Sequence, residues 1–390
     1  MKNDPAKSAE SNQAHNKPAK IKLFIFWCLL VIISLVAMEL ISFTVLKLTK
    51  RKGTYRDRVV QVKNPFHPYL GHVHAPNITF EISKGLSRKM RIATDENGYS
   101  ITPSFSYVNP DITIVVTGGS TMFGVGSSDN STTVPSILER LINQRLNIRA
   151  EVVNLALRGG QSFQEMLLVD RFLAENHADL VLPISGRNDV AYAISDPTVE
   201  GAFLNKHVWE NAVPLVHKAE RGKFMIINLI SKLLSLSYTY DLLSRGSAES
   251  STLNLRREAL TTFKNRAKIT ATHYAATDQI SKMNGANFVM ILQPTLYYKN
   301  IWTEFEVRRL KRQHGSENSI EKYRQNEHEF YEAFRKIKKP FQFIDLSNIF
   351  LEYSETLYID QCHYNDLGAE KLAEKVLESI RPLLNEIRDR

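Results

Sequence analysis

Short apolar runs alternate with amphipathic stretches over residues 111–390, and this alternation constrains the fold more than any other feature of the chain. Apolar runs of four to eight residues predict buried strands, and apolar residues at helical spacing between them predict covering helices. Such alternation is typical of a parallel sheet with helices on both faces, in which ligands bind at the carboxyl ends of the strands. The predicted strands are 112–117, 151–154, 180–184, 287–292 and 343–346, and the clearest helices between them are 132–145 and 163–175.

A second constraint lies near the N-terminus, where residues 23–46 are predominantly apolar and Glu39 is the only charge. This run is long enough to cross a bilayer as one helix, so it predicts a single membrane anchor after a polar tail, 1–22. A cleaved signal peptide is the alternative, but the run is longer than a usual signal-peptide core and no small-residue cleavage site follows it. Glu39 is compatible with a partner helix, and more simply with a protonated or snorkelling carboxyl.

Two features of the sequence indicate opposite orientations for this anchor. Lys17, Lys20 and Lys22 directly precede the run and six basic residues follow it over 47–58, which would place the following domain in the cytoplasm. Large carboxyl-terminal domains, however, translocate largely regardless of charge. A short tail, one span and a large domain are the usual layout of an envelope enzyme. We therefore expect a single-pass membrane protein with a periplasmic or otherwise extracytoplasmic domain.

Charge and cysteine content narrow the possible partners. The net charge of +9 would suit nucleic acid, but much of the excess lies in the tail and beside the span, where anionic lipid headgroups explain it. We expect no nucleic-acid partner, and the sequence indicates no protein partner. Cys28 lies in the span and Cys362 in the main domain, so the soluble part has no internal disulfide. Neither metal-ligand spacing nor a redox pair is present, and no metal or cofactor is predicted.

Two further stretches complete the predicted organisation. Residues 47–110 are rich in turn residues and are expected to form a juxtamembrane lead-in packed on the main domain, 111–390. Within that domain the regular pattern fails over 195–283, which we interpret as a largely helical insertion. The charged stretch 304–339 predicts a solvated helix pair.

Chemistry-bearing residues follow the first and the last predicted strands. Ser120 comes after the first strand and the turn Gly118-Gly119, while Asp360 and His363 lie three residues apart beyond the fifth. A serine hydroxyl becomes a nucleophile when an imidazole takes its proton and a carboxylate orients that imidazole. Of the eleven histidines, only His363 combines a position between a strand and a helix with a carboxylate just before it. The sequence therefore predicts Ser120 as nucleophile, His363 as base and Asp360 as its partner.

Two more strand ends offer donors for a developing oxyanion. Gly159 follows the second strand, with Gly160 as the alternative, and Asn188 follows the third. Donors fixed where negative charge appears are typically worth about 3 kcal/mol each in acyl transfer. Singly, each of these residues is a common turn former or helix cap. Their order at successive strand ends predicts one acyl-transfer site.

These blocks resemble the SGNH or GDSL hydrolases, whose signature residues fall on Ser120, Gly159, Asn188 and His363, with the family's aspartate at Asp360. The resemblance covers 111–390 apart from the predicted insertion. It implies a three-layer α/β/α fold with a mainly parallel five-stranded, flavodoxin-like sheet.

The resemblance has departures as well as further support. The first block reads Gly-Gly-Ser-Thr where the name-giving version has Gly-Asp-Ser-Leu, and Ala156 stands where the second block often has glycine. The lead-in motifs 67–71 and 94–98 also look like those of membrane-anchored bacterial members.

The resemblance and the anchor together imply a small acyl group, such as acetyl, on a cell-envelope glycan. Water would release the acid, whereas a sugar hydroxyl would accept the acyl group and make the enzyme an O-acyltransferase. A lipid or short-chain ester is an alternative substrate, and a non-catalytic glycan-binding component of an envelope assembly is an alternative function. Tyr297, Tyr298 and Trp302 follow the fourth strand and form either a sugar-stacking wall or, as we favour, core.

Overall fold

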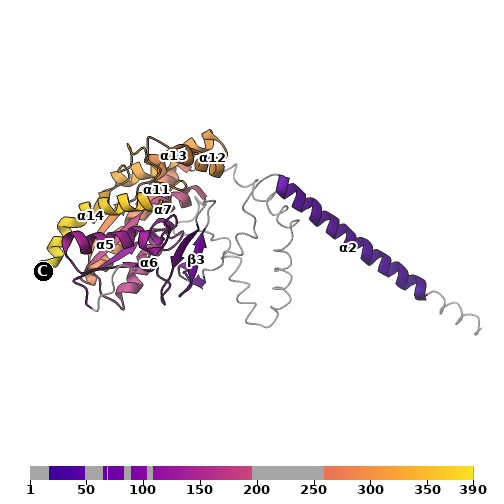
Figure 1. Cartoon of the computed structure of the whole chain (residues 1–390), viewed down its shortest axis with the longest axis horizontal. Helices are drawn as coiled ribbons and strands as arrows, with labels where there is room; N and C mark the ends of the chain where they lie inside the picture. Colours follow the sequence, from indigo (N-terminus) through magenta and orange to yellow (C-terminus); the bar gives the residue numbers. More distant parts are fainter. Residues whose placement is uncertain are drawn as a thin grey trace, which may run out of the picture. The chain divides into compact units, whose positions relative to one another are not determined.

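The computed structural model describes six stretches of the chain, which fall into two units (Figure 1). One unit contributes the helix α2 (Lys17–Leu48), and the other contains the remaining described residues. Most of the predicted polar tail and residues 196–258 of the predicted insertion lie outside these stretches. The described stretches are 17–48, 65–67, 69–82, 89–102, 109–195 and 259–389.

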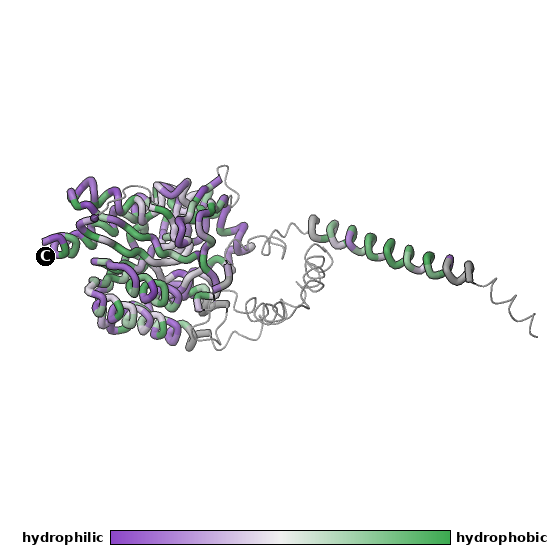
Figure 2. Tube along the Cα trace, turned by 90° about the horizontal axis from the view of Figure 1, so that it is seen from below, coloured by the Kyte–Doolittle hydropathy of each residue, from purple (hydrophilic) through white to green (hydrophobic). Residues whose placement is uncertain are grey.

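The helix α2 contains the predicted span. Its segment Lys22–Val45 is long and apolar enough to cross a membrane, and Figure 2 shows hydrophobic residues along most of it. A segment of this kind near the N-terminus is also compatible with a signal sequence. The structure thus supports a candidate span, and its orientation stays a prediction.

A five-stranded parallel sheet forms the centre of the second unit, as the sequence predicted. Its order is β6-β5-β7-β8-β9, so the chain leaves β5 for one neighbour and later returns to the other side. In open sheets of this kind, ligands bind at the carboxyl ends of the strands where the order reverses, which here lies beside β5. The strands are β5 (Ile112–Thr117), β6 (Ala150–Asn154), β7 (Leu180–Ser185), β8 (Asn287–Leu292) and β9 (Gln342–Asp345).

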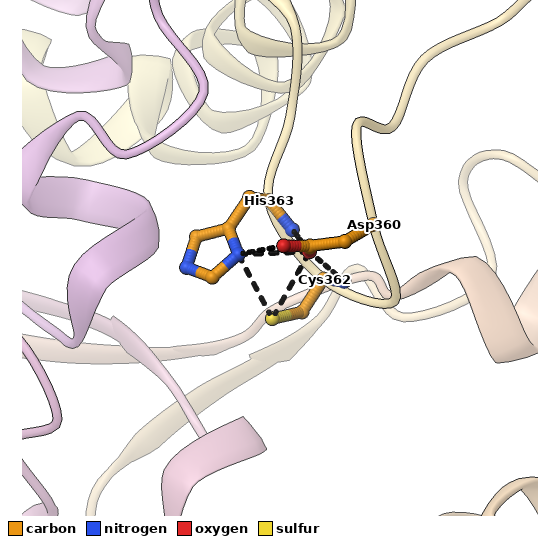
Figure 3. Close-up of side chains that lie close together, drawn as sticks. All are labelled: Asp360, Cys362 and His363. Carbon is orange, nitrogen blue, oxygen red and sulfur yellow. Dashed lines mark hydrogen bonds and ion pairs between the residues drawn. The ribbon is translucent and has the colours of Figure 1, made fainter. Parts of the chain in front are cut away.

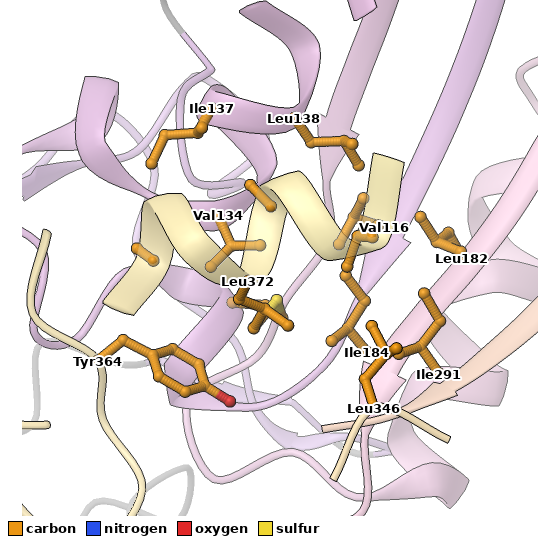
Figure 4. Packing of buried hydrophobic residues seen from close by; sticks show 14 of the residues in the cluster. Val116, Val134, Ile137, Leu138, Leu182, Ile184, Ile291, Leu346, Tyr364 and Leu372 are labelled. Atoms are coloured by element: carbon orange, nitrogen blue, oxygen red, sulfur yellow. The ribbon is translucent and has the colours of Figure 1, made fainter. Parts of the chain in front are cut away.

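Helices cover both faces of the sheet and form two separate cores. Alternate residues of a strand face opposite sides, so Ile114 and Val116 of β5 join one core while Val115 joins the other. Figure 4 shows the first core, with Leu372 of α14 beside the strand residues. The helices on this face are α5 (Val134–Leu146) and α14 (Asp366–Arg388); the other face carries α6 (Ser162–Leu173), α7 (Arg187–Ser195), α11 (Ala259–Met283) and α13 (Glu317–Lys336). The predicted three-layer α/β/α fold is confirmed.

The helix α11 lies inside the stretch that the sequence pattern marked as an insertion. It packs against α6, α13 and β8, and Phe263, Ala267 and Tyr274 are buried in the second core. Apart from the charged Arg266 and Asp278, the rest of its buried face is Ala, Thr and Ser rather than a stripe of large aliphatic residues. That composition explains why the helix was not recognised as part of the sheet's cover.

The lead-in contributes two antiparallel pairs of short strands. They are β1 (Phe66–His67) with β2 (Gly71–His72), and β3 (Thr79–Ile82) with β4 (Met90–Ala93). Phe80 and Ile92 are buried in the first core, and the Asn130 side chain donates to the backbone carbonyls of Ala93 and Ile101. This segment is therefore built into the same unit as the sheet.

Candidate active site

The sequence-predicted nucleophile lies directly beyond the carboxyl end of β5. Ser120 is the first residue of the short helix α4 (Ser120–Phe123), so its backbone N–H has no partner within the helix. A Cβ atom at Gly119 would come 2.2 Å from Asn188 Nδ2. Only glycine therefore lets the chain pass so close to that amide, which brings the ends of β5 and β7 together.

Ser120, His363 and Asp360 form a continuous hydrogen-bonded series. Ser120 Oγ lies 2.7 Å from His363 Nε2, although 243 positions separate the two residues. His363 Nδ1 lies 2.8 Å and 2.9 Å from the two carboxylate oxygens of Asp360, and Figure 3 shows the other ring nitrogen pointing away from that carboxylate. Because a carboxylate only accepts, Nδ1 carries the proton, and Nε2 presents its lone pair to the serine hydroxyl.

The position of Asp360 is fixed by the backbone of its own loop. Its Oδ1 accepts the N–H groups of Cys362 at 3.1 Å and His363 at 3.0 Å. The Cys362 thiol is buried and lies 3.6 Å from His363 Nδ1. Asp360, Cys362 and His363 thus have ligand atoms within 4.8 Å of one another, but the ring nitrogen and the carboxylate already bond to each other. The cluster fits a charge-relay pair.

The residues predicted as oxyanion donors follow the ends of β6 and β7. Asn188 Nδ2 donates to the carbonyl of Gly160 at 2.6 Å, and a primary amide carries a second N–H. The Gly160 N–H donates to Leu157 O at 2.7 Å and is therefore used within its own turn. Of the two glycines considered from the sequence, Gly159 is the better donor.

A buried carboxyl that the sequence analysis missed joins the ends of β5 and β7. Glu165 on α6 accepts hydrogen bonds from Thr117 Oγ1 at 2.9 Å and Ser185 Oγ at 2.6 Å. Burial raises the pKa of Glu165 to about 7, with a smaller contribution from the nearby Asp189. Glu165 lies on the same face of α6 as Leu168, Val169 and Phe172. A carboxyl on this apolar face was the sequence signal that could have identified it.

The aromatic residues after β8 belong to the core. Tyr297 is fully buried, and its hydroxyl lies 2.7 Å from His314 Nε2. Tyr298 is also buried and stacks on Tyr331. Trp302 is partly buried against the first core. The core alternative, rather than a sugar-stacking wall, is the one that the structure shows.

At the carboxyl edge of this doubly wound sheet, Ser120, His363 and Asp360 form a hydrogen-bonded series that can activate a serine hydroxyl. Neither a family model nor a curated protein matches the sequence. The strand order, 2-1-3-4-5 in chain sequence, is that of a flavodoxin-like doubly wound sheet, which is the sheet that the resemblance implied.

Solved structures similar to this one include the three that follow. An acetyl xylan esterase is 13% identical, with 69% of this chain and 100% of that chain covered and a TM-score of 0.36. TesA is 13% identical, with 70% and 99% covered and a TM-score of 0.35. The psychrotrophic esterase EstA from Pseudoalteromonas sp. is 12% identical, with 70% and 98% covered and a TM-score of 0.34. Similarity at this level carries no argument about activity, which rests on the site geometry.

Proposed function

We propose that the protein is a serine esterase of SGNH type that acts through an acyl-serine intermediate. Ser120 Oγ attacks the ester carbonyl carbon while His363 Nε2 takes the hydroxyl proton, and Asp360 stabilises the imidazolium. The 2.7 Å contact between Ser120 Oγ and His363 Nε2 is the observation that carries this proposal. The negative charge that develops on the carbonyl oxygen is held by the backbone N–H groups of Ser120 and Gly159 and by the Asn188 amide.

The remaining steps return every group to its starting state. The tetrahedral intermediate collapses, the ester C–O bond breaks, and the leaving alcohol takes the proton from His363. Water then attacks the acyl-serine with His363 as base, which releases the acid and restores the Ser120 hydroxyl. A sugar hydroxyl in place of water would give the same two half-reactions with transfer of the acyl group, and the enzyme would then be an O-acyltransferase.

The proposed substrate is a small acyl group, such as acetyl, on a cell-envelope glycan. The candidate span in α2 supports a membrane-tethered protein, and we infer an extracytoplasmic domain following the anchor 23–46 and the lead-in 47–110. A lipid or short-chain ester is the alternative substrate. A non-catalytic glycan-binding role is less favoured, because a binding module gains nothing from a histidine that bridges a serine and a carboxylate.

Release of acid from a panel of acetylated glycans and short-chain esters tests the proposal. The full-length protein in detergent is compared with Ser120→Ala, and a fluorophosphonate probe followed by peptide mapping locates the reactive serine. We expect release by the native protein, loss of release in the variant and labelling at Ser120. Equal release by both proteins would show that the serine mechanism is wrong. Adding a sugar acceptor distinguishes transfer from hydrolysis.

A further inference from the structure

Two histidines of the lead-in hold the peptide groups of Arg158, the residue directly before Gly159. His72 Nε2 lies 2.8 Å from the Arg158 carbonyl oxygen, and the Arg158 N–H donates to His74 Nε2 at 3.3 Å. Residues two apart in an extended chain face the same side, so both imidazoles reach the same turn. Both main-chain polar groups of Arg158 are thus held by a segment that precedes the sheet in sequence.

The two hydrogen bonds require different protonation patterns. A carbonyl only accepts, so His72 Nε2 carries a proton. A backbone N–H only donates, so His74 Nε2 presents a lone pair, and its other nitrogen bonds the backbone of Gly98. Burial, together with the nearby Arg158 charge, holds the pKa of His74 well below its ordinary value. The His74 ring is therefore neutral, as its contact with the Arg158 N–H needs.

His74 also contacts the helix that begins at Ser120. Its ring centroid lies 4.1 Å from that of Phe123 in α4 and 5.6 Å from that of Phe80. A Cβ atom at Gly98 would come 2.4 Å from the His74 carbonyl oxygen, so the 95–98 turn supports the His74 backbone from behind. One buried side chain, 4% exposed, therefore touches both elements that carry the backbone donors of the proposed oxyanion hole.

We propose that His74, assisted by His72, is a positioning residue that fixes the spacing between the Ser120 and Gly159 donors. The inference rests on the proposed esterase function and adds a part of the site that lies outside the four signature blocks. Donors act efficiently when they are preorganised around the oxyanion, and a displacement of about 1 Å lowers a rate by up to about 100-fold.

The test compares His74→Phe, which keeps a ring against Phe123 but loses the acceptor, with His74→Gln, whose side-chain oxygen restores one. The substrates are a matched oxoester and thionoester. Sulfur accepts N–H hydrogen bonds poorly, so the ratio of kcat/KM for the oxygen and sulfur esters reports on the oxyanion hole. We expect His74→Phe to lower kcat for the oxoester by about 10- to 100-fold, with a smaller change in KM and a lower ratio. His74→Gln should recover much of both.

Leu70→Ala is the matched structural control. Leu70 is buried in the same segment against Leu157 and Leu168 but makes no side-chain hydrogen bond to the turn. We expect a lower melting temperature and an unchanged oxygen-to-sulfur ratio. Should His74→Phe fail to fold, Gly98→Ala provides a second displacement of His74 and should lower the ratio.

The outcomes separate this inference from the proposed function. A native protein without Ser120-dependent ester turnover contradicts the esterase proposal itself. Ser120-dependent turnover with an unchanged ratio in the folded His74 or Gly98 variants overturns the positioning role alone, as does a ratio that falls equally in Leu70→Ala.

Discussion

The structure contains two groups of one serine, one histidine and one aspartate, and they differ in which residue stands in the middle. In the first, His363 lies between Ser120 and Asp360. In the second, Ser162 lies in the middle: its hydroxyl donates to Asp189 at 2.7 Å and lies 2.9 Å from His273 Nδ1. The same three residue types are thus joined in two different orders.

The order of the bonds decides the chemistry. The single proton of Ser162 is given to Asp189, so the same oxygen accepts from His273 Nδ1, which then has no lone pair to act as base. Ser162 is fully buried, and Asp189 also accepts from Thr270 at 3.0 Å. The second group therefore ties α6, α7 and α11 together, whereas only the first can activate a hydroxyl. The residue types alone, which are the same in both groups, do not distinguish the catalytic group from the structural one.

Removing the two serines in turn gives the largest expected contrast. Ser120→Ala should lower kcat for an ester substrate by about 10⁴-fold or more, because the nucleophile is lost. Ser162→Ala should change kcat by only a few-fold and lower the unfolding free energy by about 1–3 kcal/mol, because buried hydrogen bonds are lost. Steady-state kinetics and urea unfolding measure the two effects. Comparable loss of kcat in both variants would contradict the assignment of roles.

The two aspartates provide the next contrast. Asp360→Asn should lower kcat by about 10³- to 10⁴-fold, because an amide no longer fixes the His363 tautomer or stabilises the imidazolium. Asp189→Asn should mainly lower the melting temperature, since this carboxylate serves hydroxyl and backbone donors of the scaffold. If Asp360→Asn kept the native kcat, the Asp360 carboxylate would not be needed for catalysis.

Asn188 directly precedes Asp189 on α7, but it is proposed to act with Ser120 as an oxyanion donor, whereas Asp189 bonds to Ser162. Asn188→Ala should lower kcat by about 10²- to 10³-fold with little change in KM, as for other oxyanion donors. Gly119→Ala should have a similar effect, because the added Cβ would displace the same amide. The double variant should lose little more than either single variant, since both remove one donor. Additive losses would mean that Gly119 acts on something else.

The last prediction concerns Glu165, which joins the ends of β5 and β7 and affects stability rather than kcat. Its folded-state pKa of about 7 exceeds the ordinary value of 4.5, so between these values the folded protein holds a proton that the unfolded chain has released. Stability from this residue is therefore present below pH 4.5 and falls as the pH rises towards about 7, by on the order of 3 kcal/mol. Urea unfolding across that range should show this slope in the native protein. Equal slopes in native protein and Glu165→Gln would contradict the raised pKa.

The sequence predicted the sheet well because its strands are continuous apolar runs. The strands at 112–117 and 287–292 match β5 and β8 at both ends. The strand order was implied only by the family resemblance, because periodicity says nothing about which strands pair. α11 lies in the stretch that was expected to be largely helical, but its packing on the sheet was not predicted, because its buried face has few large aliphatic side chains.

The site was predictable where chemistry and strand position coincide. Ser120, Asn188 and His363 each follow a strand and carry a reactive or donating group, so their meeting could be expected. Glu165 and His74 make buried contacts with segments distant in sequence, and the partners in these contacts cannot be identified from the sequence alone. Residues that hold a site are harder to find than residues that perform its chemistry.

The bond between residues 120 and 363 has a consequence for how activity arises. A chain that has assembled β5 to β8 already displays the serine, but as an ordinary alcohol. Its activation waits until the loop before α14 arrives and that helix docks on α5. During refolding, esterase activity would therefore appear only after the loop before α14 has reached Ser120. Partly folded molecules that lack this contact would not cleave the ester.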